Sequence, residues 1–423
     1  MIHLHLSGKK MVIVGNGCAG AECIQALRES GYNDKIHLLT DSRWPVSNPM
    51  LTTYFVAGKI GFDGLFPYGA GQEFYRKYGV DVYPESPVVA LDAQQKVLYA
   101  KSGLELKYDK CLIATGATPV LPPVEGIGSN RIYTVRTVED AIRLKEALTK
   151  TPKKALVIGA SMVGIKVVEL FYKAGVEVCL ADLAQHIFPL AAHPECACRI
   201  EDRLEQKGIK LRFGAGIDKV EETTYGVRAY FEGSPEGEDA DLLVMCIGVK
   251  ANTGFIDRRQ VAVDKGILVD GHMRTHMPGL YAAGDVAQGK NLRSGASQII
   301  GLWNNARYQG RTAGRNMAGG DEIFPGNISH NITHFMGMDF VGMGDVDGYD
   351  KMEKTFDGKS FIQLFWKGGL LAGANFLDSF TESGAIKNAL IKGLRQTGPV
   401  LSGSLPVIQN QLIKKILLEV ERA

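Results

Sequence analysis

Two glycine-rich segments have the residue spacing that lets backbone amides hold a diphosphate. In the first, Gly15, Gly17 and Gly20 follow the apolar run MVIV and open AECIQALRES, which has helical periodicity. In such a turn the first glycine permits a tight bend, the second lets N–H groups approach a phosphate, and the third allows close packing of helix on strand. The helix N-terminus favours the negative charge. The next predicted strand, KIHLLTD, ends on Asp41, which can accept hydrogen bonds from a ribose diol. The segment therefore predicts a dinucleotide site.

The second segment, KALVIGASMVGIKVVELFYKAGVEVCLAD, repeats this order with Gly159, Ser161, Gly164 and Asp182. Ser161 replaces the middle glycine, and we expect its hydroxyl to compensate with a hydrogen bond to the phosphate. The residues after Asp182 contain no arginine for a 2′-phosphate, which predicts NADH rather than NADPH, although His186 can carry a positive charge. Two such folds predict two dinucleotides, a soluble hydride donor and a bound flavin.

The strands and helices that hold these two glycine turns are expected to belong to more than one hydrophobic core. A chain of 423 residues is expected to form two or three domains. A net charge of +2 gives no reason to expect a nucleic-acid partner. The sequence shows no secretory pattern and no apolar run of membrane-spanning length, so we expect a cytoplasmic protein without a membrane partner.

Cysteine usage argues against metal or disulfide chemistry. The seven cysteines form no CxxC or CxxxxC pair and lie in apolar runs, so we expect buried, reduced thiols. Cys196 and Cys198 are two residues apart, a spacing that turns their side chains in different directions on a helix. No metal site is predicted.

Further segments carry a resemblance that covers essentially the whole chain. YDKCLIATGATPVLPPVEG, MCIGVKANTGF, GILVDGHMRTHMPGLYAAGDVA and LWNNARYQGRTAGRNMAG occur in the order found in the pyridine nucleotide–disulfide oxidoreductases. The sequence resembles this family. The resemblance implies an α/β fold with two Rossmann-like domains, the NAD domain inserted in the FAD domain, and a small α/β C-terminal domain. The implied ranges are 1–117 and 250–324 for FAD, 118–249 for NAD, and 325–423 for an interface-type domain.

The resemblance also implies which residues touch each cofactor. Thr115 and Gly116 are expected close to the FAD, Gly284 to precede a helix, and Asp285 to bond the ribityl chain. The full FAD set comprises Gly15, Asn16, Gly17, Cys18, Ala19, Gly20, Asp41, Asn48, Pro49, Val88, Ala114, Thr115, Gly116, Gly284, Asp285 and Trp303. The NAD set comprises Gly159, Ala160, Ser161, Met162, Val163, Gly164, Asp182, Ile247 and Gly248.

One difference from the disulfide reductases decides the subgroup. Asn48 occupies the position of the cysteine that single-thiol members retain, and the chain has no cysteine between Cys23 and Cys111. SNPMLTTYFVAG is instead similar to NADH:rubredoxin reductases, ferredoxin reductases and nitrite reductase flavin modules. Two further departures are Thr53, where relatives have lysine, and Lys166, where they have glutamate. We interpret Lys166 as a positive charge that raises the flavin potential; the alternative is a lysine pointing into solvent.

The resulting expectation is an FAD enzyme that takes hydride from NADH and passes electrons to an external acceptor. The acceptor is a rubredoxin, a ferredoxin or an iron–sulfur partner enzyme; dioxygen or a small molecule is the alternative, which would make the chain an NADH oxidase. A third hypothesis, outside the enzymes, is a protein that senses the NADH/NAD⁺ ratio.

A basic docking face is expected on two C-terminal helices, SGAIKNALIKGL and NQLIKKILLEVERA. The apolar runs around KGG predict a hairpin. Both a homodimer and a monomer are compatible with the sequence. The basic residues of that face are Lys387, Lys392, Arg395, Lys414 and Lys415.

Overall fold

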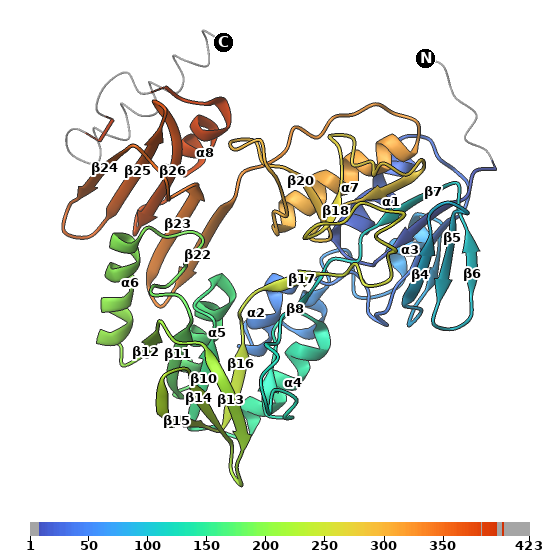
Figure 1. Ribbon diagram of the computed structural model, residues 1–423. Coiled ribbons are helices and arrows are strands. Elements are labelled where there is room, and N and C mark those ends of the chain that lie inside the picture. Colours follow the sequence, from blue (N-terminus) through green and yellow to red (C-terminus); the bar gives the residue numbers. More distant parts are fainter. Residues whose placement is uncertain (1–7, 382, 396–399, 402–423) are drawn as a thin grey trace. The chain divides into compact units, whose positions relative to one another are not determined.

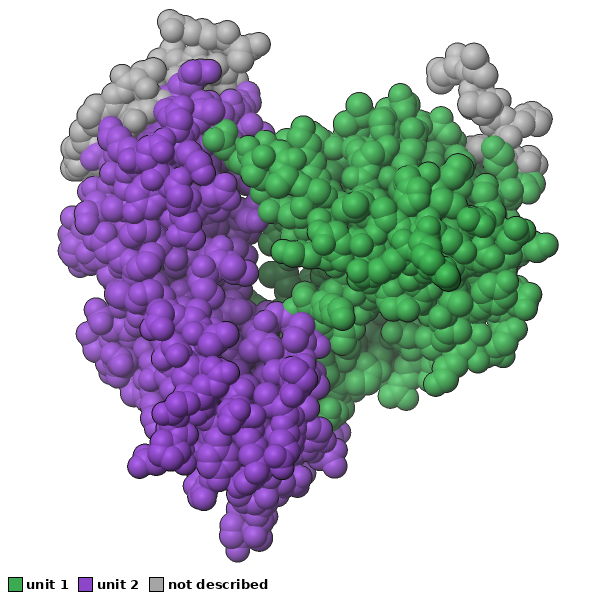
Figure 2. Space-filling view, viewed as in Figure 1, with its two compact units in different colours: residues 1–118, 136–145, 249–327 green, residues 119–135, 146–248, 328–423 purple. Residues whose placement is uncertain are grey.

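The structure, a computed structural model, describes residues 8–381, 383–395 and 400–401 (Figure 1). The chain divides into two compact units, coloured separately in Figure 2. Unit 1 comprises residues 1–118, 136–145 and 249–327, and unit 2 comprises 119–135, 146–248 and 328–423. The chain first leaves unit 1 within β8 (Ala117–Pro119), returns to it for residues 136–145, and returns again at β17 (Val249–Ala251). Strands β8 and β17 pair with each other. Helix α4 (Val138–Thr149) contributes residues to both units.

A five-stranded parallel sheet forms the centre of unit 1. The central run MVIV is buried along its whole length, as a strand covered on both faces requires. In spatial order the strands are β19 (Leu280–Ala282), β7 (Lys110–Ile113), β1 (Met11–Val14), β2 (Ile36–Leu39) and β3 (Val80–Tyr83). All four pairings are parallel, with Met11 opposite both Ile36 and Lys110.

Two helices cover one face of this sheet, α1 (Cys18–Glu29) and α7 (Trp303–Met317). They approach closely because α7 carries Gly310 and Gly314 against α1. A Cβ at Gly310 would lie 2.3 Å from the carbonyl oxygen of Ala19, and one at Gly314 would lie 2.6 Å from that of Cys23. A second core cluster on the other face includes the antiparallel strands β4 (Val88–Asp92), β5 (Val97–Ala100) and β6 (Glu105–Lys107).

Short elements complete unit 1. They are the turns of 3-10 helix η1 (Pro49–Leu51) and η2 (Phe62–Leu65), helices α2 (Thr52–Val56) and α3 (Glu73–Lys77), and strands β18 (Ile267–Leu268), β20 (Ala287–Lys290) and β21 (Ser297–Gln298).

Unit 2 contains a second five-stranded parallel sheet. Its strands, in spatial order, are β12 (Lys210–Phe213), β11 (Glu177–Asp182), β10 (Lys154–Ile158), β16 (Leu242–Met245) and β9 (Ile132–Tyr133). Helix α5 (Met162–Lys173) follows β10, and helix α6 (Pro194–Gln206) precedes β12. Strands β13 (Ile217–Glu222), β14 (Val227–Phe231) and β15 (Ser234–Ala240) form a smaller antiparallel sheet that shares a core cluster with the parallel one. The two parallel sheets confirm the predicted α/β class with two Rossmann-like folds.

The C-terminal part of unit 2 is an antiparallel sheet with a helix, α8 (Ser383–Lys392). The predicted hairpin is confirmed: Lys367 pairs with Leu370 across Gly368 and Gly369, both of which have positive φ. The second predicted helix, NQLIKKILLEVERA, lies outside the described residues. The strands, in spatial order, are β22 (His330–Phe335), β23 (Met338–Gly344), β26 (Leu370–Leu377), β25 (Phe361–Lys367) and β24 (Lys351–Phe356).

The two units do not test the expected three-domain boundaries, which stay a prediction. No helix in the described part of the chain has both the length and the apolar character needed to span a bilayer.

Candidate dinucleotide-binding sites

The first glycine turn joins β1 to α1 at the carboxyl end of the unit 1 sheet. Gly15 has φ +109°, and a Cβ there would lie 2.2 Å from the carbonyl oxygen of Ala114. A Cβ at Gly20 would lie 2.4 Å from the carbonyl oxygen of Gly15. Gly17 differs, because within the described residues no heavy atom lies within 4 Å of a Cβ built there. Two glycines are therefore required by the fold, and Gly17 keeps open the place where a phosphate would approach.

The second turn, between β10 and α5 in unit 2, is built in the same way. Gly159 has φ +110°, and a Cβ there would lie 2.4 Å from the carbonyl carbon of Cys246. A Cβ at Gly164 would lie 1.9 Å from the carbonyl oxygen of Gly159. Each turn is also tied to the neighbouring strand: Gly15 N–H donates to Leu39 at 2.8 Å, and Gly159 N–H donates to Ala181 at 2.7 Å.

Ser161 makes the two turns chemically different. Its hydroxyl donates to the carbonyl oxygen of Cys246 at 2.9 Å and accepts from Gly164 N–H at 3.2 Å, which caps α5. The expected hydrogen bond from this hydroxyl to a phosphate stays a prediction; to make it, the hydroxyl proton must turn away from the carbonyl of Cys246. By contrast, no side chain in the described structure caps α1, whose N-cap residue is Gly17.

The two acids predicted to end the second strands, Asp41 and Asp182, lie in different surroundings. Asp182 is the last residue of β11; its carboxylate accepts from Ala160 N–H at 2.6 Å and from Ala184 N–H at 2.8 Å. Each oxygen keeps a second acceptor site for a ribose hydroxyl. Asp41 is exposed and lies beyond β2, which ends at Leu39, so the strand is shorter than expected.

The segment ATG (114–116) is held by a residue that the sequence analysis did not single out. The side-chain amide of Asn252 donates to the backbone carbonyl of Thr115 at 2.9 Å, and the backbone carbonyl of Asn252 accepts from the Thr115 hydroxyl at 2.9 Å. Its backbone N–H also donates to Gly116. Asn252 belongs to the quoted return segment MCIGVKANTGF, but its contact with Thr115 joins residues 137 positions apart, so no local pattern indicated it.

The second FAD signature folds differently from the expectation. Gly284 does not precede a helix: a turn follows it and leads into β20, and α7 begins only at Trp303. The helix still reaches this glycine, because Gln309 of α7 accepts from Gly284 N–H at 2.9 Å. Asp285 accepts from the guanidinium of Arg136 at 2.7 Å. Arg136 was not predicted, because the contact joins residues 149 positions apart.

The remaining predicted FAD residues lie in unit 1. Asn48 caps η1 by accepting from Met50 N–H at 3.0 Å, with Pro49 as the first residue of that turn. Asn16 accepts from the Tyr75 hydroxyl and donates to the carbonyl of Trp44. Ala19 and Ala114 are buried, and Val88 is the first residue of β4.

The thiols of unit 1 are poorly suited to redox chemistry. Burial raises the pKa of Cys18 to about 12, and burial also raises the pKa of Cys23 and of Cys111. Because the thiolate is the nucleophile, a raised pKa disfavours reaction at these three thiols. The prediction of buried thiols holds for six of the seven cysteines and is wrong for Cys198, which is exposed on α6.

Lys166 lies on α5 and does not point into solvent, so the alternative interpretation is wrong. Its ammonium donates to Glu169 at 2.6 Å and to the carbonyl of His334 at 2.6 Å, and the side chain is 19% exposed. Burial of Glu169 opposes its ionisation, but hydrogen bonds from Lys166, Lys173 and the N–H of Met336 outweigh burial and lower its pKa to about 2. The charge of Lys166 is therefore partly compensated.

The remaining predicted NAD residues also lie in unit 2. Met162 and Val163 begin α5, Ile247 is partly exposed, and Gly248 has positive φ.

The predicted basic face is only partly described. Lys387 lies 3.1 Å from a ring nitrogen of His330, and burial lowers its pKa. Lys392 and Arg395 are exposed, whereas Lys414 and Lys415 lie outside the described residues.

Comparison with known proteins agrees with this geometry. Residues 9–310 match the family described as pyridine nucleotide-disulphide oxidoreductase. The chain belongs to this family. It is accordingly an oxidoreductase that uses a flavin and a pyridine nucleotide.

One relative of this chain is the NADH-dependent phenylglyoxylate dehydrogenase subunit epsilon of Aromatoleum evansii. The two are 29% identical over 90% of this chain and 91% of the relative. Another is the rubredoxin-NAD(+) reductase of Pseudomonas putida, 27% identical over 81% of this chain and 88% of the relative. A solved structure of a NAD-dependent persulfide reductase from A. fulgidus has a TM-score of 0.88 at 23% identity, covering 98% of this chain and 83% of that one. This last similarity concerns the fold.

Proposed function

We propose that this chain is an NADH:acceptor oxidoreductase that binds FAD in unit 1, takes NADH in unit 2, and passes electrons to a separate protein without a redox-active cysteine. The observation that carries the proposal is the pair of equivalent glycine turns, each at the carboxyl end of a parallel sheet. An enzyme with two such turns has a place for two dinucleotides.

The residues of unit 1 would act on FAD by binding and orientation. The open space at Gly17 and the N-terminus of α1 suit the pyrophosphate, and Asp41 suits a ribose. The Arg136–Asp285 pair and the Asn252 clamp on Thr115 hold two loops in fixed positions. Bound FAD supplies the hydride acceptor, and the protein supplies orientation and exclusion of water.

In unit 2, Asp182 supports NADH rather than NADPH as the donor. Its carboxylate is oriented by two backbone N–H groups and would repel a 2′-phosphate while accepting from a ribose hydroxyl. A higher kcat/KM with NADPH than with NADH would contradict this assignment.

The absence of a sulfur relay is supported by two features. Asn48 occupies the position of the expected cysteine and is used to cap η1. Cys18, Cys23 and Cys111 are all buried, and burial raises the pKa of each thiol.

A protein acceptor is supported by the relatives. One is a subunit of an NADH-dependent dehydrogenase and another a rubredoxin reductase, and the chain covers most of the length of both. We therefore favour an iron–sulfur or rubredoxin-type partner, either a small carrier or a larger redox enzyme, over dioxygen.

The test is a comparison of reoxidation rates. The flavin-loaded protein is reduced anaerobically with NADH and mixed with rubredoxin, with ferredoxin or with air-saturated buffer. The proposal predicts that NADH bleaches the flavin and that a protein carrier reoxidises it faster than dioxygen does. Faster reoxidation by air than by either carrier favours the oxidase alternative, and a protein that binds no flavin refutes the proposal.

A further inference from the structure

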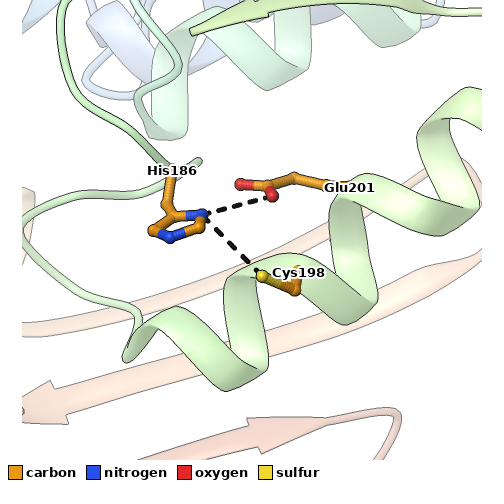
Figure 3. Close-up of side chains that lie close together, drawn as sticks. All are labelled: His186, Cys198 and Glu201. Atoms are coloured by element: carbon orange, nitrogen blue, oxygen red, sulfur yellow. Dashed lines mark hydrogen bonds and ion pairs between the residues drawn. The ribbon is translucent and has the colours of Figure 1, made fainter. Parts of the chain in front are cut away.

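Three potential metal ligands of different chemistry converge in unit 2. Cys198 and Glu201 are three residues apart on α6 and therefore share one face of the helix. His186 comes from the loop that follows β11. Its Nδ1 atom lies 3.3 Å from Glu201 Oε2 and 3.8 Å from Cys198 Sγ (Figure 3). All three ligand atoms lie within 4.8 Å of one another.

One nitrogen of this cluster has two polar neighbours of different chemistry. A neutral imidazole carries at most one proton on Nδ1, yet this one nitrogen faces both the thiol and the carboxylate, as the two dashed lines in Figure 3 show. A cation at the centre would bind the lone pairs of all three atoms at once. Tetrahedral zinc with bonds of ~2.0–2.3 Å places its ligand atoms ~3.3–3.8 Å apart. The separations of His186 Nδ1 from Glu201 Oε2 and from Cys198 Sγ fall in this range.

The surroundings orient one ligand and leave the site accessible. The N–H of Ile187 donates to the other oxygen of Glu201, Oε1, at 2.8 Å, so that Oε2 is directed toward His186. A hydrogen bond of this kind fixes a ligating carboxylate in many metal sites. Cys198 is exposed, and the His186 side chain is 35% exposed, so a cation can enter and a water molecule can complete the coordination.

The loop that carries His186 is anchored on both sides. Before it, Asp182 accepts from Ala160 N–H; after it, Phe188 N–H donates to the carbonyl of Ala160 at 2.9 Å. Further on, His193 N–H donates to Asn375 at 2.7 Å. The ring is thus presented by a constrained segment, so little ordering is required for a cation to bind.

We propose that His186, Cys198 and Glu201 bind one zinc-class divalent cation, with solvent in the fourth position. A mixed sulfur, nitrogen and oxygen set suits Zn²⁺ or Co²⁺ and does not suit Mg²⁺ or Ca²⁺, which prefer oxygen ligands. Binding releases the thiol proton of Cys198 to solvent and involves no redox step. The cation would fasten the loop after β11 to α6. This inference does not depend on the proposed function.

The experiment uses the full-length chain, stripped of metal with a chelator and dialysed against Zn²⁺. We expect about one zinc per chain, an X-ray absorption spectrum with one sulfur ligand, and a higher Tm with zinc because the cation binds the folded state. Cys198→Ser, His186→Gln and Glu201→Gln should each weaken binding at least ~10-fold. Glu205→Gln, an exposed acid one turn further along α6, is the matched control and should bind as the parent does.

Two results would overturn the proposal. The first is bound zinc with no sulfur in its coordination sphere. The second is zinc binding that survives all three ligand variants unchanged. Circular dichroism of each variant without metal tests whether the fold is retained. Because Cys198 is exposed, we expect its serine variant to be the least disruptive of the three.

Discussion

Among single residues, the glycines of the first turn are expected to differ in what they are needed for: Gly20 is needed for folding, and Gly17 for binding of the ligand. Gly20→Ala places a Cβ 2.4 Å from a backbone oxygen, so we expect a large loss of folded protein. Gly17→Ala meets open space, so we expect a normal Tm but weaker retention of flavin, because the methyl group occupies the phosphate approach. Thermal unfolding and flavin release on ultrafiltration measure the two effects. Equal flavin retention in Gly17→Ala and the parent would contradict this assignment.

The Lys166–Glu169 pair predicts that the stability of the fold depends on pH. The pKa of Glu169 is lowered from 4.5 to about 2, so the pair stabilises the fold fully above about pH 4.5 and loses this effect as the pH falls toward 2. Lys166→Met removes one of the groups that lower the pKa. We expect its acid unfolding, followed by circular dichroism, to occur at a higher pH than in the parent. The exposed Lys150, changed to Met, is the control and should leave the transition in place.

Lys166 also carries the flavin-tuning hypothesis, which stays a prediction. The same Lys166→Met variant should lower the flavin midpoint potential, because a positive charge favours the reduced cofactor. The shift should be smaller than for an unpaired lysine, since Glu169 compensates part of the charge. Potentiometric titration with a reference dye measures it, and an unchanged potential would remove Lys166 from the account.

At the scale of elements, the contact of α1 with α7 depends on the two glycines of α7. Gly310→Ala would place a methyl group 2.3 Å from a backbone oxygen of α1. Overpacking of this kind costs about 1–3 kcal/mol, so calorimetry should show a lower Tm. Gly384→Ala in α8 is the matched control, because no described atom lies within 4 Å of its Cβ and alanine favours a helix. Equal Tm values for the two variants would show that the helices separate without cost.

Some of these elements could be predicted from the sequence and others could not. Apolar β-branched runs, glycines at fixed spacing and an acid near the end of the next strand are local signals, and they located both turns and the strands next to them. The residues that were missed, Asn252 and Arg136, act through contacts between distant segments, which no local pattern encodes. The helix expected after Gly284 was wrong because the chain forms β20 and β21 before α7 begins. The metal-ligand cluster was missed because the loop of His186 had to be placed against α6 before the cluster was visible.

At the scale of the whole molecule, the choice of acceptor is an electrostatic question. Small iron–sulfur carriers are commonly acidic, and Lys392 and Arg395 are exposed on the C-terminal part of unit 2. If these residues form a docking face, the kcat/KM for ferredoxin should fall as ionic strength rises, because salt screens the attraction. Lys392→Glu should lower it further without changing the rate of flavin reduction by NADH. A salt-independent rate would place the docking face elsewhere.

The central claim is that electrons leave this protein from the flavin and not from a sulfur pair. An anaerobic titration of the flavin-loaded protein with NADH tests it most directly. We expect complete bleaching of the flavin at about one NADH per flavin, because the flavin would be the one two-electron centre. Consumption of about two NADH per flavin, or a long-wavelength thiolate-to-flavin absorption band, would reveal a redox-active cysteine and contradict the account.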